Sequence, residues 1–111
     1  MVPEIVYLFG FSPRICNRLD KLTKVISNQV SADHSVGLAL LHDAVVGAGP
    51  EGTVPDSIRS LLRMGVKVYA LGPDLDARGI SSRPLQEGIQ RIDYDELMEI
   101  VTATKTLCSW M

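Results

Sequence analysis

"VKVYALGPDLDARGI" (66–80) is the stretch that decides the fold. Apolar residues dominate its first half and stop at Gly72-Pro73, where a proline cannot continue the hydrogen-bonded ladder of a strand. A short charged segment follows and ends on a glycine, the residue preferred just beyond the end of a helix. The stretch therefore predicts a buried strand over 66–72 and one or two helical turns over 73–79.

Apolar runs alternate with amphipathic segments on both sides of this stretch. Three further short apolar runs predict strands at 4–10, 35–43 and 88–92, and apolar residues at helical spacing predict helices at 12–30, 53–65 and 93–106. Strands that alternate with helices form a parallel sheet covered on both faces. We therefore expect one α/β domain over 1–111, a three-layer αβα sandwich with a mainly parallel sheet of four or five strands.

Several helix ends carry recognisable signals. Ser12 is the expected N-cap of the first helix, with Pro13 at its first position. Gly65 is the expected C-terminal glycine of the second helix, and Asp93 with Glu96 forms a capping-box pattern at the start of the last. The glycine-rich segment 47–55 is expected to be a loop.

Composition narrows the class of protein. The 111 residues include 11 basic and 13 acidic residues, so no basic surface for DNA, RNA or a membrane is expected. No run is apolar for long enough to span a membrane, and the start does not resemble a signal peptide. The two cysteines form no disulfide framework, which favours the cytoplasm. The apolar fraction of 46% favours a buried face in an oligomer.

Polar residues follow the predicted strands at their carboxyl ends, where open parallel sheets bind ligands. His42 and Asp43 follow the second strand, Asp74 follows the third, and Asp93 follows the fourth. His42 beside Asp43 is a candidate general base with an orienting carboxylate. The alternative is that both side chains cap neighbouring backbone, and Asp74 is expected to cap the helical turn behind it.

Three residues elsewhere are candidates for function. Cys16 lies near the amino end of the first helix, where the helix dipole favours a thiolate; the alternative is an ordinary cysteine facing the core. Trp110 and Met111 close an apolar tail, which we expect to dock on its own domain or on a neighbouring subunit. The histidines and cysteines have no zinc spacing and no phosphate-binding glycine motif occurs, so we expect no metal and no cofactor.

The chain resembles the DsrH/TusB family of the DsrE/DsrF/DsrH sulfur-relay proteins. The matching features are Ser12-Pro13 after the first strand, "LALLHDAV" (38–45), "VYALGPDLDARGI" (68–80), "IDYDELMEIV" (92–101) and the terminal "SWM" (109–111). This resemblance implies a DsrE-like fold. It also implies assembly with DsrE/DsrF-like (TusD/TusC-like) subunits or with itself, and the transfer of persulfide sulfur between carrier proteins.

Three hypotheses follow from these observations. The first is an accessory, non-catalytic subunit of a cytoplasmic sulfur-relay assembly, serving 2-thiolation of the tRNA wobble uridine or sulfur oxidation as the resemblance implies. The second is an autonomous sulfurtransferase with Cys16 as its persulfide carrier. The third is a module that binds a small ligand at the cluster of His42, Asp43 and Asp74.

Overall fold

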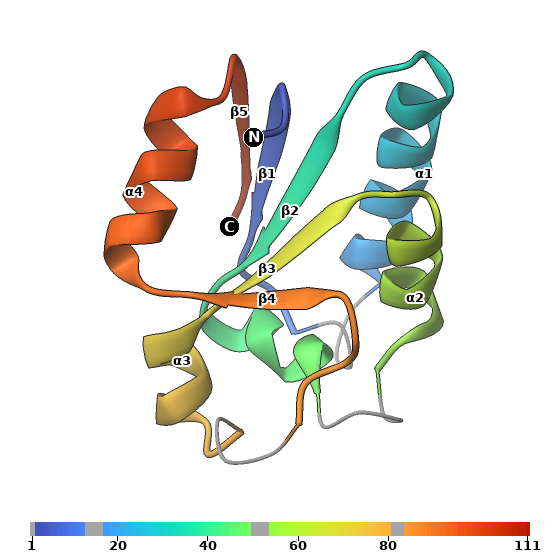
Figure 1. The fold of residues 1–111 in the computed structure, drawn as a ribbon. Coiled ribbons are helices and arrows are strands. Elements are labelled where there is room, and N and C mark those ends of the chain that lie inside the picture. Colours follow the sequence, from blue (N-terminus) through green and yellow to red (C-terminus); the bar gives the residue numbers. More distant parts are fainter. Residues whose placement is uncertain (1, 13–16, 50–53, 81–83) are drawn as a thin grey trace.

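Five strands, each parallel to its neighbours, form the centre of the molecule in the computed structural model (Figure 1). The structure describes residues 2–12, 17–49, 54–80 and 84–111. The strands are β1 (Ile5–Phe9), β2 (Val36–Leu40), β3 (Lys67–Leu71), β4 (Ile89–Ile92) and β5 (Thr106–Trp110), in the spatial order β4-β3-β2-β1-β5. The helices are α1 (Arg18–Ser31), the 3-10 helix η1 (His42–Ala48), α2 (Asp56–Arg63), α3 (Gly72–Ala77) and α4 (Tyr94–Ala103).

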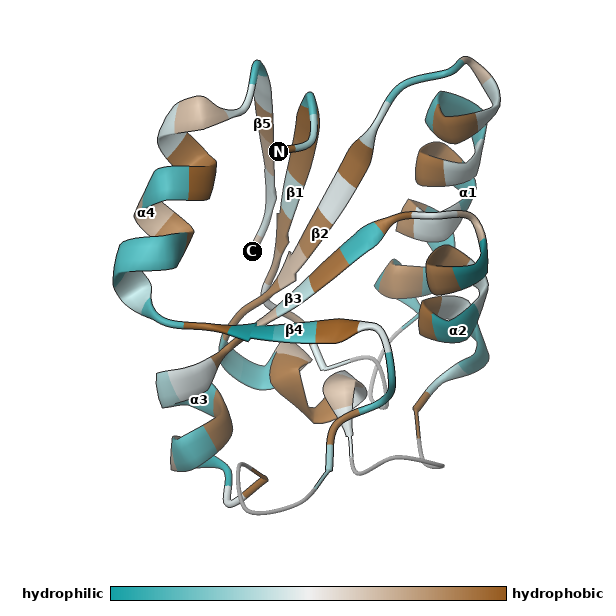
Figure 2. Ribbon diagram, viewed as in Figure 1, coloured by the Kyte–Doolittle hydropathy of each residue, from teal (hydrophilic) through white to brown (hydrophobic). Residues whose placement is uncertain are grey.

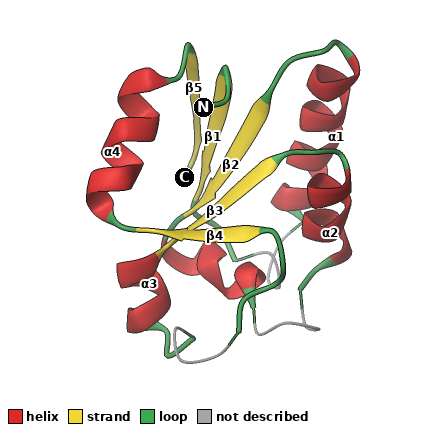
Figure 3. Cartoon of the chain, in the orientation of Figure 1, coloured by secondary structure: helices red, strands yellow, loops and turns green. Residues whose placement is uncertain are grey.

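The sheet is covered on both faces, which explains why β2 is apolar throughout. All five β2 residues are buried, and alternate ones enter two different clusters: Leu38 and Leu40 pack toward α1 and α2, and Ala39 packs toward α4. Figures 2 and 3 show α1 and α2 on one side of the sheet, with α4 on the other. Apolar residues on both faces of a strand are the mark of a buried parallel sheet. The predicted three-layer α/β architecture is confirmed.

The predicted glycine at the end of α2 and the predicted capping box of α4 are both confirmed. Gly65 adopts a positive φ of 86° beyond α2, and Val66 N–H donates to the Leu61 carbonyl, as in a Schellman motif. In α4, the Asp93 carboxylate accepts from Glu96 N–H, and the Glu96 carboxylate accepts from Asp93 N–H. These contacts stop α2 and start α4 at fixed residues, and so set where β3 begins and β4 ends.

Two predicted boundaries were wrong at the carboxyl ends of β1 and β2. Helix α1 begins at Arg18, so Ser12 is not its N-cap; Pro13 and Cys16 lie outside the described residues. Strand β2 ends at Leu40, and the chain then turns into η1 rather than continuing extended to 43. Ala44, Val45 and Ala48 of η1 are buried, so core packing orders the end of the expected strand and the first residues of the expected loop.

The C-terminal segment also differs from the prediction. Helix α4 ends at Ala103, and the tail forms β5, which pairs in parallel with the outer edge of β1 (Figure 1). The tail therefore docks on its own domain, one of the two expected outcomes. The pairing depends on the unpaired backbone groups along the free edge of β1, and the sequence of the tail contains no sign of that edge. Among the described residues, no helix has the length and hydrophobicity needed to cross a membrane.

Candidate functional site at the carboxyl edge of the sheet

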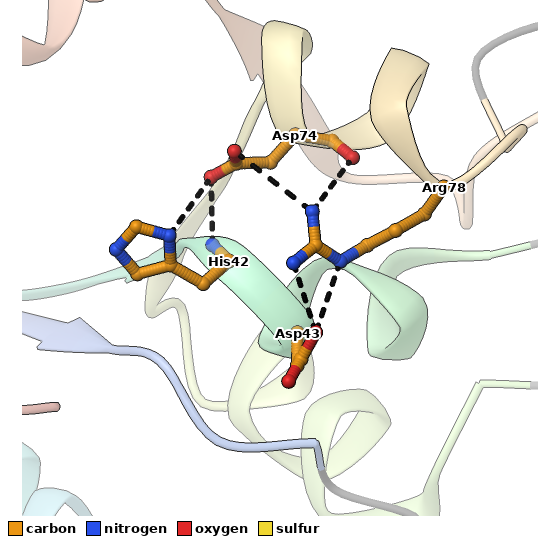
Figure 4. A network of polar contacts seen from close by, with 4 residues as sticks. All are labelled: His42, Asp43, Asp74 and Arg78. Atoms are coloured by element: carbon orange, nitrogen blue, oxygen red, sulfur yellow. Dashed lines mark hydrogen bonds and ion pairs between the residues drawn. The ribbon is translucent and has the colours of Figure 1, made fainter.

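The carboxyl ends of the strands place His42 and Asp74 next to each other. His42 opens η1 after β2, and Asp74 lies in the first turn of α3 after β3. Because β2 and β3 are adjacent and parallel, these two connections meet at one edge of the sheet. His42 N–H donates to Asp74 Oδ2 at 2.6 Å, and His42 Nδ1 lies 4.0 Å from the same oxygen (Figure 4).

His42 holds an unusual backbone conformation. Its φ is +50°, in the left-handed region that costs a non-glycine residue about 1 kcal/mol or more. The Asp74 carboxylate is only 14% exposed and compensates by accepting the His42 N–H. The imidazole itself is 61% exposed. Asp74 therefore fixes the backbone of His42, while the imidazole of His42 remains accessible to solvent.

Arg78 joins the remaining members of the cluster. Its Nη2 donates to Asp43 Oδ1 at 2.8 Å and its Nε donates to the same oxygen at 3.2 Å. On the other side, Arg78 Nη1 donates to the Asp74 carbonyl at 3.4 Å and lies 4.0 Å from Asp74 Oδ1. Figure 4 shows the guanidinium between the two aspartates. We call His42, Asp43, Asp74 and Arg78 the edge network.

This geometry corrects two expectations. Asp43 pairs with Arg78, and the carboxylate near His42 is that of Asp74, so His42 and Asp43 do not form an acid–base pair. Asp74 does not cap α3, because no side chain caps that helix; its carboxylate serves the neighbouring η1 instead. Arg78 was not among the predicted site residues. The signal for it was its position four residues after Asp74, on the same side of a helical turn.

The predicted C-terminal residues approach the same edge from the β5 side. Trp110 carbonyl accepts from Gly10 N–H at 3.1 Å, and Trp110 packs partly buried against the larger core cluster. A Cβ placed on Gly10 would lie 3.4 Å from Met111 Cγ and 3.6 Å from His42 Cδ2. Both are ordinary van der Waals distances, which shows that the chain after β1, the start of η1 and the residue after β5 lie close together.

Asp93 does not join the edge network. Its carboxylate caps α4, and it lines a separate open hollow of about 400 Å³ together with Asp76, Arg91 and Glu96. Arg91 Nη2 donates to Asp76 Oδ1 at 3.1 Å, and its guanidinium lies 3.1 Å from where a Cβ on Gly72 would stand. A side chain at position 72 would push this guanidinium away.

Three ionisable groups among the described residues have shifted pKa values and lie outside the edge network. Burial raises the pKa of Tyr7, although its hydroxyl donates to Gln29 Oε1 at 2.8 Å, and burial also raises the pKa of Tyr69. The backbone hydrogen bond from Ser35 lowers the pKa of Glu4, at the opposite edge of the sheet, and His34 lowers it further. The Glu4–Ser35 contacts hold the amino ends of β1 and β2 together, and none of these three groups belongs to the edge network.

The cysteines are the remaining candidates. Cys16 lies outside the described residues. Cys108 is half-buried on β5, opposite Tyr7 of β1. Within the described ranges, no group of three or more histidine, cysteine or acidic side chains is arranged to hold a metal ion. The edge network can therefore fix a binding surface and present an imidazole, and its carboxylates already have donors.

The family match and the curated relatives of this chain agree on one family. Residues 11–106 match the family described as DsrH like protein. The chain is 32% identical over 80 residues to Protein TusB of Pectobacterium parmentieri and 31% identical over 80 residues to Protein TusB of Pectobacterium atrosepticum; each match covers 72% of this chain and 80% of the relative. The crystal structure of the ychN protein from E. coli superposes with a TM-score of 0.81 at 22% identity, over 98% of this chain and 100% of that one.

Proposed function

Because the chain belongs to the DsrH/TusB family, we propose that it is a subunit of a sulfur-relay assembly that passes persulfide sulfur between proteins. The observation that carries this proposal is the family match, which extends from residue 11 to residue 106 and so includes most of the fold and the whole edge network. The DsrE-like fold, supported by the structural neighbour, is consistent with it.

The finer assignment is to 2-thiolation of the tRNA wobble uridine in the cytoplasm, with TusD-like and TusC-like subunits as partners. Its support is that both curated relatives carry the name TusB. The net charge of −2 favours contact with tRNA through partner proteins rather than directly, since RNA binding needs positive charge near the phosphates. Sulfur oxidation is the alternative pathway for the same kind of assembly.

Within such an assembly, the edge network serves as a preorganised docking surface. His42 is exposed while its backbone is fixed by Asp74, and Asp43 is held by Arg78. Groups held in place before binding lose less conformational entropy when a partner arrives. Trp110 and Met111 end beside Gly10 and extend this surface toward β5.

Co-assembly tests the subunit proposal. The chain would be mixed with purified TusC-like and TusD-like proteins and followed by size-exclusion chromatography and thermal unfolding. We expect a joint peak and a raised Tm, and we expect His42→Ala to weaken assembly. His34→Ala is the matched control, because His34 lies beside Glu4 at the amino ends of the strands, away from the edge network. A chain that elutes alone and melts unchanged would contradict the proposal.

Sulfur loading separates an accessory subunit from an autonomous sulfurtransferase. The reduced protein would be incubated with a cysteine desulfurase and cysteine, and its intact mass measured for the wild type, Cys16→Ser and Cys108→Ser. An accessory subunit gains no sulfur. A gain of one sulfur atom that Cys16→Ser abolishes and Cys108→Ser retains would make Cys16 the persulfide carrier.

A further inference from the structure

Strand β5 is an open edge of the sheet without the usual protection. It is the last strand in the order β4-β3-β2-β1-β5, and among the described residues no segment pairs with its outer side (Figure 1). Natural edge strands are commonly protected by charged residues, proline or bulges. The opposite edge, β4, carries Arg91, but β5 has the uncharged sequence TLCSW.

The backbone of β5 shows which groups are free to pair. Thr106 N–H donates to the Glu4 carbonyl at 2.9 Å, and the Trp110 carbonyl accepts from Gly10 N–H, so these residues direct their backbone groups toward β1. Backbone groups of successive strand residues point to alternate sides. Leu107 and Ser109 therefore direct their N–H and C=O groups outward, away from the sheet.

An antiparallel pairing of β5 with a second β5 has one register that pairs the whole strand. In that register Leu107 faces Ser109 of the second copy, and these residues exchange N–H···O=C bonds. Thr106 faces Trp110, a favourable cross-strand combination, and Cys108 faces Cys108 on the two-fold axis. The strand brings no charge to the seam, so two copies meet without repulsion.

Exposed apolar side chains border this edge. Leu107 lies on β5 itself and Met111 directly follows it, and both are exposed. Burying such side chains at the seam adds hydrophobic stabilisation to the backbone bonds.

We propose that the outer edge of β5 pairs antiparallel with β5 of a second copy of this chain, so that two five-stranded sheets join into one. The partner is a second copy because the register is self-complementary and closes a two-fold dimer, the commonest symmetry of soluble oligomers. This inference does not depend on sulfur transfer, since it rests on the strand edge alone.

Oxidative cross-linking tests the register. Cys108 pairs occupy a non-hydrogen-bonded position, with Cα atoms about 4.5 Å apart, inside the roughly 4.4–6.8 Å that disulfides span. In the Cys16→Ser variant, Cys108 is the only cysteine; diamide accepts the two hydrogen atoms that two thiols lose as the disulfide forms. We expect a covalent dimer that is absent from Cys108→Ser.

Analytical ultracentrifugation tests the edge without relying on a cysteine. Ser109→Pro removes one outward N–H from each copy, which weakens the dimer by about tenfold or more, and it leaves the N–H groups that face β1 in place. Ser109→Ala keeps the N–H and should dimerise as the wild type does, and circular dichroism verifies that both variants fold.

The outcomes are distinct. A wild type that stays at the 12.1 kDa of one chain across the concentration range overturns the proposal. A dimer that Ser109→Pro leaves unchanged and diamide does not cross-link through Cys108 also overturns it, and places the interface elsewhere. Neither result bears on the co-assembly and sulfur-loading tests of the proposed function.

Discussion

Replacing Asp74 with alanine removes the acceptor that holds η1 against α3. The Asp74 carboxylate, largely shielded from solvent, accepts His42 N–H at 2.6 Å and lies beside Arg78. A hydrogen bond to a charged acceptor contributes about 2 kcal/mol, and its loss leaves a backbone donor without that partner. The freed chain can relax the positive φ of His42, which returns up to about 1 kcal/mol.

The net expectation is therefore a loss of about 1–2 kcal/mol in the free energy of unfolding. For a domain of this size that corresponds to a fall in Tm of roughly 4–8 °C. Urea unfolding at neutral pH, followed by circular dichroism, measures the first quantity, and a thermal melt measures the second. Asp74→Asn keeps an oxygen acceptor and should lose less.

Asp43→Ala is the matched control, because it removes the other carboxylate that contacts Arg78. Asp43 is 69% exposed, so its ion pair is screened by solvent and contributes about 0.5 kcal/mol. If Asp74→Ala proves as stable as Asp43→Ala, the Asp74–His42 bond does not hold this edge, and the reasoning about a fixed docking surface fails.

Three further changes test other parts of the fold. Glu4→Gln should destabilise the protein at neutral pH and lose this effect in strong acid. The reason is that a carboxylate with a lowered pKa stabilises the fold above its usual pKa of 4.5, and this contribution disappears as the pH falls through the lowered value. Urea titrations at several pH values would measure the change. Asp93→Ala removes the capping box and should cost about 1 kcal/mol in urea unfolding, whereas the exposed Glu99→Ala should cost almost nothing. Leu38→Ala opens a cavity at the centre of the sheet and should lower stability by about 2–5 kcal/mol; a smaller loss would mean that the site collapses around the missing side chain.

The sequence by itself determined the alternation of elements. The turn at Gly72-Pro73, the glycine at 65 and the capping pattern at Asp93 depend on backbone geometry and on contacts within a few residues. Such local preferences can be read from residue order. The carboxyl-edge placement of His42 and Asp74 also followed, because parallel strands end at one edge.

The tertiary structure decided what local preference leaves open. The tail became β5 because β1 had a free edge, and pairing with a distant strand overrides the weak helical pattern that ran on past residue 103. Asp74 serves His42 rather than its own helix because η1 brings an N–H within reach, from 32 residues away in the chain. Both outcomes rest on hydrogen bonds between segments that are far apart in sequence, and only folding brings such donors and acceptors together.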